Sequence, residues 1–209
     1  MASAVRRAVR RIPINLQRAI QVQLSNVPPT ATPADLRRLI YRSQVQGVED
    51  VSIEYRHLSP TGRAYVKLTH SDFLQPSLDA LESVTISGVH TIAEPSDRPP
   101  LAAQLEGNGL SSELDSNGRY VAVWGLPKAV GPETLDAILG GRFAFPPGEA
   151  YIFKMPHPDT NNNFTMAARF LVRLASVSEA HRLVRELHMT YYQPEIHKTN
   201  YPLRARVIY

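Results

Sequence analysis

The chain has 209 residues, no cysteine and a formal net charge of +4 at pH 7, a length that suffices for two small domains. The absence of cysteine excludes disulfides, cysteine-ligated zinc sites and thiol catalysis. No apolar stretch is long enough to cross a bilayer as a helix, so the sequence predicts no membrane insertion.

Residues 1–20 form a basic N-terminal segment. The segment contains no acidic residue and five arginines, namely Arg6, Arg7, Arg10, Arg11 and Arg18. This Arg-rich, acid-free composition is typical of a mitochondrial transit peptide, so we expect the protein in the mitochondrial matrix. The alternative is a basic arm that stays in place and binds nucleic acid.

Residues 21–95 carry the pattern of a small mixed α and β domain. In chain order we expect a strand at 21–27, a helix from Pro33, a strand at 51–56, a turn at 59–62, a strand at 64–69, a helix after Ser71 and a strand within 84–92. Thr32 and Ser71 are placed to cap the two helices, and Gly88 predicts a bend in the last strand.

Residues 96–118 are rich in Pro, Ser and Gly and are predicted to be a linker. Formal charge is distributed unevenly around it. The first domain carries six basic and eight acidic residues, whereas residues 119–209 carry eleven basic and seven acidic residues. Attraction to a polyphosphate is therefore expected mainly in the second half of the chain.

Residues 119–209 repeat the pattern of the first domain. Val121 to Pro127 corresponds to Val22 to Pro28 at an offset of 99 positions (121 minus 22). The expected elements are a strand at 120–126, a helix from Pro132, a strand at 151–155, a strand at 168–174, a helix capped by Ser176 and Glu179 and a strand at 204–209. A long loop is expected between the second and third of these strands. Such duplication favours a tandem binding protein over an enzyme with one cleft.

The order βαββαβ, found twice, predicts an α+β fold class with two ferredoxin-like domains, each a four-stranded antiparallel sheet backed by two helices. Strand one followed by Asn26-Val27-Pro28 or by Gly125-Leu126-Pro127, with the later segment 62–68, resembles the RNA recognition motif (RRM) family. The resemblance covers most of the chain, and it implies two RRM-like domains.

An RRM binds single-stranded RNA by stacking bases on aromatic side chains of strands one and three. In the first domain the resemblance places Gln23, Arg63 and Tyr65 at these positions, and only Tyr65 is aromatic. Lys67 follows as a candidate RNA contact. Alternatively, Lys67 and Arg63 are both solvated, or Arg63 pairs with Glu54 across the hairpin.

In the second domain the equivalent positions hold Ala122, Arg169 and Leu171. Trp124 lies two residues beyond Ala122 and is expected on the same face of the sheet. We predict that Trp124 and Arg169 hold a base between indole and guanidinium, with Arg173 beside them to contact phosphate. The alternative is that Trp124 packs under the linker or a tail.

The other face of the second sheet is expected to form the core, with Phe170 in it. Strand two leaves two registers open. If Ile152 is in the core, Tyr151 and Phe153 join the RNA-binding face, and otherwise Lys154 does.

Other candidate chemistry is unconvincing. Residues 157–159 match the His-Pro-Asp tripeptide of J-domain cochaperones, but they lie between predicted strands rather than between two helices. His181 and His188 are too far apart for the common i, i+4 metal-binding spacing, and residues 107–109 lack the strand and basic residue of a phosphate loop. We therefore expect no catalytic residue, no metal and no cofactor.

The sequence thus predicts a non-catalytic RNA-binding protein of mitochondrial gene expression, which contacts single-stranded or ribosomal RNA mainly through the second sheet. The alternative is a structural or adaptor subunit of a mitochondrial ribonucleoprotein complex such as the mitoribosome, whose sheets mainly bind protein subunits. The missing stacking aromatics and the acidic first domain favour that alternative.

Overall fold

The computed structural model describes residues 18–56, 58–97, 117–148, 150–155 and 167–209. These residues form two compact units, each built on one four-stranded sheet. Most of the basic N-terminal segment, the interior of the linker, the long loop of the second domain and its His-Pro-Asp tripeptide lie outside the described residues. Within the described part of the chain, no helix is both long and apolar enough to span a membrane.

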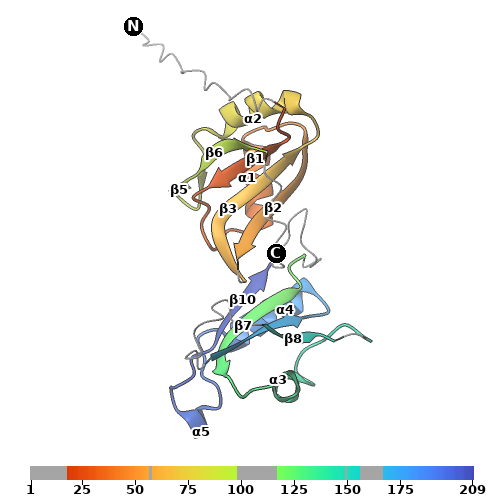
Figure 1. The fold of residues 1–209 in the computed structure, drawn as a ribbon, viewed down its shortest axis with the longest axis vertical. Coiled ribbons are helices and arrows are strands. Elements are labelled where there is room, and N and C mark those ends of the chain that lie inside the picture. The colour runs from red at the N-terminus through yellow and green to blue at the C-terminus, as the bar shows by residue number, and fades with distance from the viewer. Residues whose placement is uncertain (1–17, 57, 98–116, 149, 156–166) are drawn as a thin grey trace. The chain divides into compact units, whose positions relative to one another are not determined.

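The first unit has the predicted βαββαβ order, with its sheet arranged β2-β3-β1-β6 (Figure 1). Its elements are β1 (Gln21–Ser25), α1 (Pro33–Arg42), β2 (Val48–Arg56), β3 (Ser59–Leu68), the 3-10 helix η2 (Ser71–Phe73), α2 (Leu74–Leu81), β4 (Thr85–Ile86), β5 (Val89–His90) and β6 (Ile92–Ser96). Apolar residues of α1 and α2 are buried with Val22, Leu24 and Val66 of the strands, so the two helices cover one face of the sheet.

The fourth strand of the first sheet is β6, and its prediction within 84–92 is wrong. Residues 85–90 instead form the separate β4–β5 hairpin, in which Ile86 pairs with Val89. Ser87 and Gly88 between them have φ angles of 51° and 81°. Two consecutive residues of positive φ make a tight two-residue hairpin turn. The chain therefore reverses completely where only a bend was expected.

The turn expected at 59–62 is also wrong, because these residues already belong to β3. Gly62 accounts for the misleading turn signal. Its φ is 82°, and its carbonyl accepts a hydrogen bond of 2.8 Å from the backbone N–H of Val27. The glycine therefore allows a local irregularity within strand β3 and does not mark a loop.

The helix starts follow the predicted caps in part. Thr32 and Asp35 form a reciprocal capping box at α1, and the hydrogen bonds from Thr32 hold the pKa of Asp35 below its ordinary value. Ser176 caps the last long helix by accepting from the backbone N–H of Glu179, whose carboxylate bonds to a preceding loop instead of closing a box. Ser71 caps no α-helix, because it opens η2.

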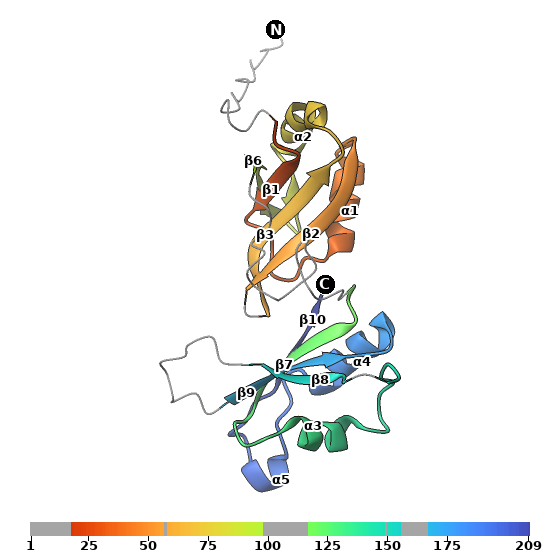
Figure 2. The same cartoon turned by 45° about the vertical axis from the view of Figure 1, so that its right-hand side comes forward.

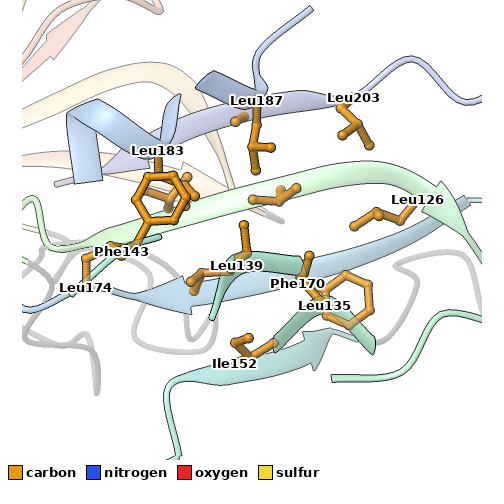
Figure 3. Close-up of a cluster of buried hydrophobic side chains, with 14 of the residues drawn as sticks. Leu126, Leu135, Leu139, Phe143, Ile152, Phe170, Leu174, Leu183, Leu187 and Leu203 are labelled. Atoms are coloured by element: carbon orange, nitrogen blue, oxygen red, sulfur yellow. The ribbon is translucent and has the colours of Figure 1, made fainter. Parts of the chain in front are cut away.

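The second unit repeats the topology, with its sheet arranged β10-β7-β9-β8. Its elements are β7 (Tyr120–Pro127), α3 (Pro132–Leu139), β8 (Ile152–Met155), β9 (Ala167–Arg173), α4 (Val177–Leu187), α5 (Pro194–His197) and β10 (Arg204–Ile208). Leucines of α3 and α4 meet the inward side chains of the sheet in one core around the fully buried Phe170 (Figure 3). The core position expected for Phe170 is thus confirmed.

Candidate nucleic-acid interface

Each sheet has one face packed on helices and an opposite face, which we call the outer face. In the second unit Val121, Val123, Phe170 and Val172 belong to the core, so the residues that alternate with them point outward. The outer face comprises Tyr120, Ala122 and Trp124 of β7, Phe153 and Met155 of β8, Arg169, Leu171 and Arg173 of β9, and Arg204, Arg206 and Ile208 of β10.

Trp124 lies between two arginines on this face. It is opposite Arg169 of β9 on one side and opposite Arg204 of β10 on the other. Directly opposed residues of antiparallel strands have Cβ atoms about 5 Å apart, so the side chains of both arginines begin beside the indole. Trp124 and Arg169 are half-buried and Arg204 is exposed. We call Arg169, Trp124 and Arg204 the tryptophan row.

A β-bulge at Gly125 orients the tryptophan. The register between β7 and β9 shifts between Trp124 and Leu126, so Trp124 lies on the outer face while Leu126 is buried in the core. Gly125 has a φ of 98°, and a Cβ atom at this position would lie 2.1 Å from the carbonyl oxygen of Pro202. Only glycine fits this bulge without displacing the neighbouring backbone.

The outer face of the second sheet is basic. Strands β7 to β10 contain no aspartate or glutamate, and four outer-face positions are arginines, namely Arg169, Arg173, Arg204 and Arg206. Arg173 lies 6.0 Å from the ring centroid of Tyr120. Within the described part of the chain, Arg169 and Arg204 form no ion pair with a carboxylate, in contrast to Arg182 on α4. Such a face attracts phosphate groups.

The middle of the outer face offers less surface to a ligand. Ala122 and the predicted contact residue Leu171 are opposite one another, and both are buried. Phe153, which is opposite Leu171 on β8, is exposed. The partly exposed side chains of the face therefore include the tryptophan row, Phe153, Arg173 and Arg206.

Strand β8 resolves the two registers left open by the sequence. Ile152 lies in the core, and Phe153 therefore joins the outer face, as predicted for this register. The same prediction is wrong for Tyr151, whose hydroxyl donates to Asp136 of α3 at 2.7 Å and so lies on the helix side. Lys154 donates to two backbone carbonyls of the β7–α3 loop, each at 2.8 Å.

Arg204 and Arg206 were missed by the sequence reasoning. Both belong to β10, where Ala205 and Val207 are buried in the core and the arginines alternate with them. The signal was present in the sequence as Arg-Ala-Arg-Val at the start of the fourth strand. In RRM-like topology the fourth strand lies next to the first, which brings Arg204 beside Trp124.

The first sheet presents a different outer face. Tyr65 is opposite Gln23, and its side chain is only 4% exposed. Its hydroxyl donates to Glu54 Oε1 at 3.0 Å, and Arg63 forms an ion pair with the same carboxylate at 3.9 Å. The pairing of Arg63 with Glu54, considered above as an alternative, is thereby confirmed.

Lys67 of the first outer face is paired as well, with Glu49 at 2.6 Å. The three candidate contacts on β3 thus face carboxylates of β2. These carboxylates repel phosphate groups and compete with them for Arg63 and Lys67. Nucleic-acid binding is therefore better supported by the second outer face than by the first.

No protein-family model matches the chain, and no curated protein matches it. Among solved structures it is similar to the two RNA recognition domains of Sex-lethal from Drosophila melanogaster, at 16% identity and a TM-score of 0.33 over 90% of this chain and 98% of that one. It is also similar to the three N-terminal RNA binding domains of the yeast splicing factor Prp24, at 14% identity and a TM-score of 0.33 over 91% and 66% of the two chains. Because these similarities are low, the assignment of two RRM-like folds rests on the strand order of each sheet.

Proposed function

We propose that this protein is a non-catalytic RNA-binding protein of mitochondrial gene expression, and that the outer face of its second domain contacts single-stranded RNA. The observation that carries the proposal is the tryptophan row on an acid-free sheet. A base stacks on the indole of Trp124 while Arg169 and Arg204 contact the flanking phosphates. Arg173 adds a further cation, and Leu171 forms part of the apolar floor of the face.

Salt dependence tests the role of the arginines. Changing Arg169 and Arg204 to Gln together should weaken binding of a single-stranded RNA oligonucleotide and flatten its salt dependence. For single strands, the slope of log K against log salt concentration changes by about 0.7 for each phosphate that the protein no longer neutralises. Fluorescence anisotropy at several salt concentrations measures both quantities on the full-length chain.

The matched control is Arg185→Gln, which removes a positive charge from an exposed position on α4. This variant should leave the slope unchanged because α4 covers the opposite face of the sheet. If Arg185→Gln and the double variant lower the slope equally per charge, binding depends on net charge alone and the tryptophan row has no special role.

The outer face of the first sheet supports a second function, that of an adaptor subunit in a mitochondrial ribonucleoprotein complex such as the mitoribosome. Its Tyr65 is buried and its cations are paired, so this outer face is better suited to a protein surface than to RNA. The two functions make different predictions for purified protein. An adaptor that binds only protein shows no affinity for single-stranded RNA even at low salt.

The basic N-terminal segment supports the mitochondrial part of the proposal. Changing Arg6, Arg7, Arg10 and Arg11 to Gln should leave a fluorescent fusion in the cytosol, because import draws positively charged segments into the matrix. Microscopy of living cells, with the unchanged fusion as reference, measures the outcome. Mitochondrial signal from the Gln variant, or nuclear signal from the unchanged chain, would show that the segment is not the targeting signal.

A further inference from the structure

A hairpin that the sequence did not predict extends the second outer face beyond β10. It comprises residues 188–203, between α4 and β10, with α5 near its tip (Figures 1 and 2). Tyr191 and Pro202 form an antiparallel bridge in it. Backbone hydrogen bonds flank this bridge, from Leu203 to Thr190 at 2.7 Å and from Tyr192 to Tyr201 at 3.0 Å. The first arm of the hairpin therefore lies where a fifth strand of the sheet would begin.

Tyr191 points toward the outer side of this arm. Its neighbour Tyr192 is buried in the core, and Leu203, which precedes β10, is also in the core. Alternation therefore directs Tyr191 and Pro202 to the same side as Arg204. The side chain of Tyr191 is 44% exposed.

Arg204 connects the tryptophan row to the hairpin. Its register partner is Trp124, and its Nη1 atom lies 2.6 Å from Sδ of Met189 in the hairpin. The guanidinium group therefore lies against the arm that carries Tyr191. A phosphate bound by Arg204 would lie beside both aromatic residues.

Contacts with the sheet and the core hold the hairpin in place. The Nδ1 atom of His188 accepts a hydrogen bond of 3.1 Å from the backbone N–H of Ala205 in β10. Farther out, the ring of His197 stacks on Tyr192 at 5.6 Å and meets the edge of Tyr201 at 5.3 Å between centroids. A platform fixed in this way binds without a large ordering cost.

From these contacts we propose that Tyr191 is a second base-stacking residue, which continues the RNA site of the proposed function past the edge of the sheet. Neighbouring strands lie about 4.8 Å apart, so an arm beyond β10 is about 10 Å from β7. One extended strand of RNA then places one base on Trp124 and a later base on Tyr191. Arg204 contacts the phosphate backbone between them.

The test compares oligouridylates of increasing length, from the dinucleotide upward, with the full-length chain. Trp124 is the only tryptophan, so quenching of its fluorescence reports the first platform alone. Short oligomers should quench the unchanged chain and Tyr191→Ala equally. For longer oligomers, Tyr191→Ala should raise Kd by about 5- to 150-fold, because it removes one stacked base.

Two controls accompany this comparison. Tyr191→Phe keeps the ring and should bind as the unchanged chain does, whereas Tyr41→Ala removes an exposed tyrosine from α1 and should have no effect. Equal affinity of Tyr191→Ala and the unchanged chain for every length would overturn the role of Tyr191 while leaving the proposed function intact. Absence of quenching and of binding with the unchanged chain would instead reject RNA binding itself.

Discussion

Changing Trp124 to Ala should weaken binding of single-stranded RNA by about 5- to 150-fold, because stacking on an aromatic side chain contributes roughly 1–3 kcal/mol per base. Trp124 is the one outer-face aromatic that lies between two arginines, so its loss removes the stacking surface and leaves the cations without a fixed base between them. Anisotropy titrations of a labelled oligonucleotide at constant salt measure the change in Kd.

Two further variants show whether the effect comes from stacking. Trp124→Phe retains an aromatic face and should recover most of the affinity, whereas Trp124→Leu retains apolar volume and should not. Phe153→Ala removes an exposed aromatic of the edge strand β8 and should have a smaller effect, because no arginine is directly opposite it. If Trp124→Leu binds RNA as tightly as Trp124→Phe, stacking does not contribute and the adaptor function becomes the better explanation.

The fold could be predicted because it depends on local patterns that occur twice. Alternation of apolar residues gave most of the strands, and the constant offset between the copies placed the first helix of each domain at Pro33 and Pro132. The errors arose where one local signal has two structural uses. Ser87-Gly88 makes a full hairpin rather than a bend, and Gly62 lies in a strand rather than in a turn.

The candidate site could be predicted only in part, because it depends on pairs that are distant in the chain. Alternation placed Trp124 and Arg169 on one face, but the approach of Arg204 follows from the position of β10 beside β7. Similarly, nothing local in Tyr65 indicates that its hydroxyl donates a hydrogen bond to Glu54. An interface predicted only from strands one and three therefore overestimated RNA contact by the first domain. It also missed Arg204 and Arg206 in the second domain.

The conformation at Gly125 also depends on a residue that is distant in the chain, Pro202. Gly125→Ala should destabilise the second domain by at least about 2 kcal/mol, because backbone strain at positive φ costs roughly 1–3 kcal/mol, and forcing an atom into a packed site typically costs another 1–3 kcal/mol. The φ of Gly125 is 98°, and its added Cβ would lie 2.1 Å from the carbonyl oxygen of Pro202. Urea denaturation of the full-length chain, followed by Trp124 fluorescence, measures the free energy of unfolding of this domain.

Gly141→Ala is the matched control for this prediction. Gly141 also has a positive φ, 74°, but among the described residues no atom beyond its chain neighbours lies within 4 Å of its added Cβ. Its substitution therefore measures backbone strain alone, and the excess loss of stability in Gly125→Ala measures the collision with Pro202.

Because relief of that collision must move Pro202 away from the bulge, it also moves Arg204 and Tyr191 relative to Trp124. RNA affinity should accordingly fall in Gly125→Ala even under conditions in which the domain remains folded. If Gly125→Ala and Gly141→Ala have equal stability and equal RNA affinity, the close approach at Gly125 does not maintain the site.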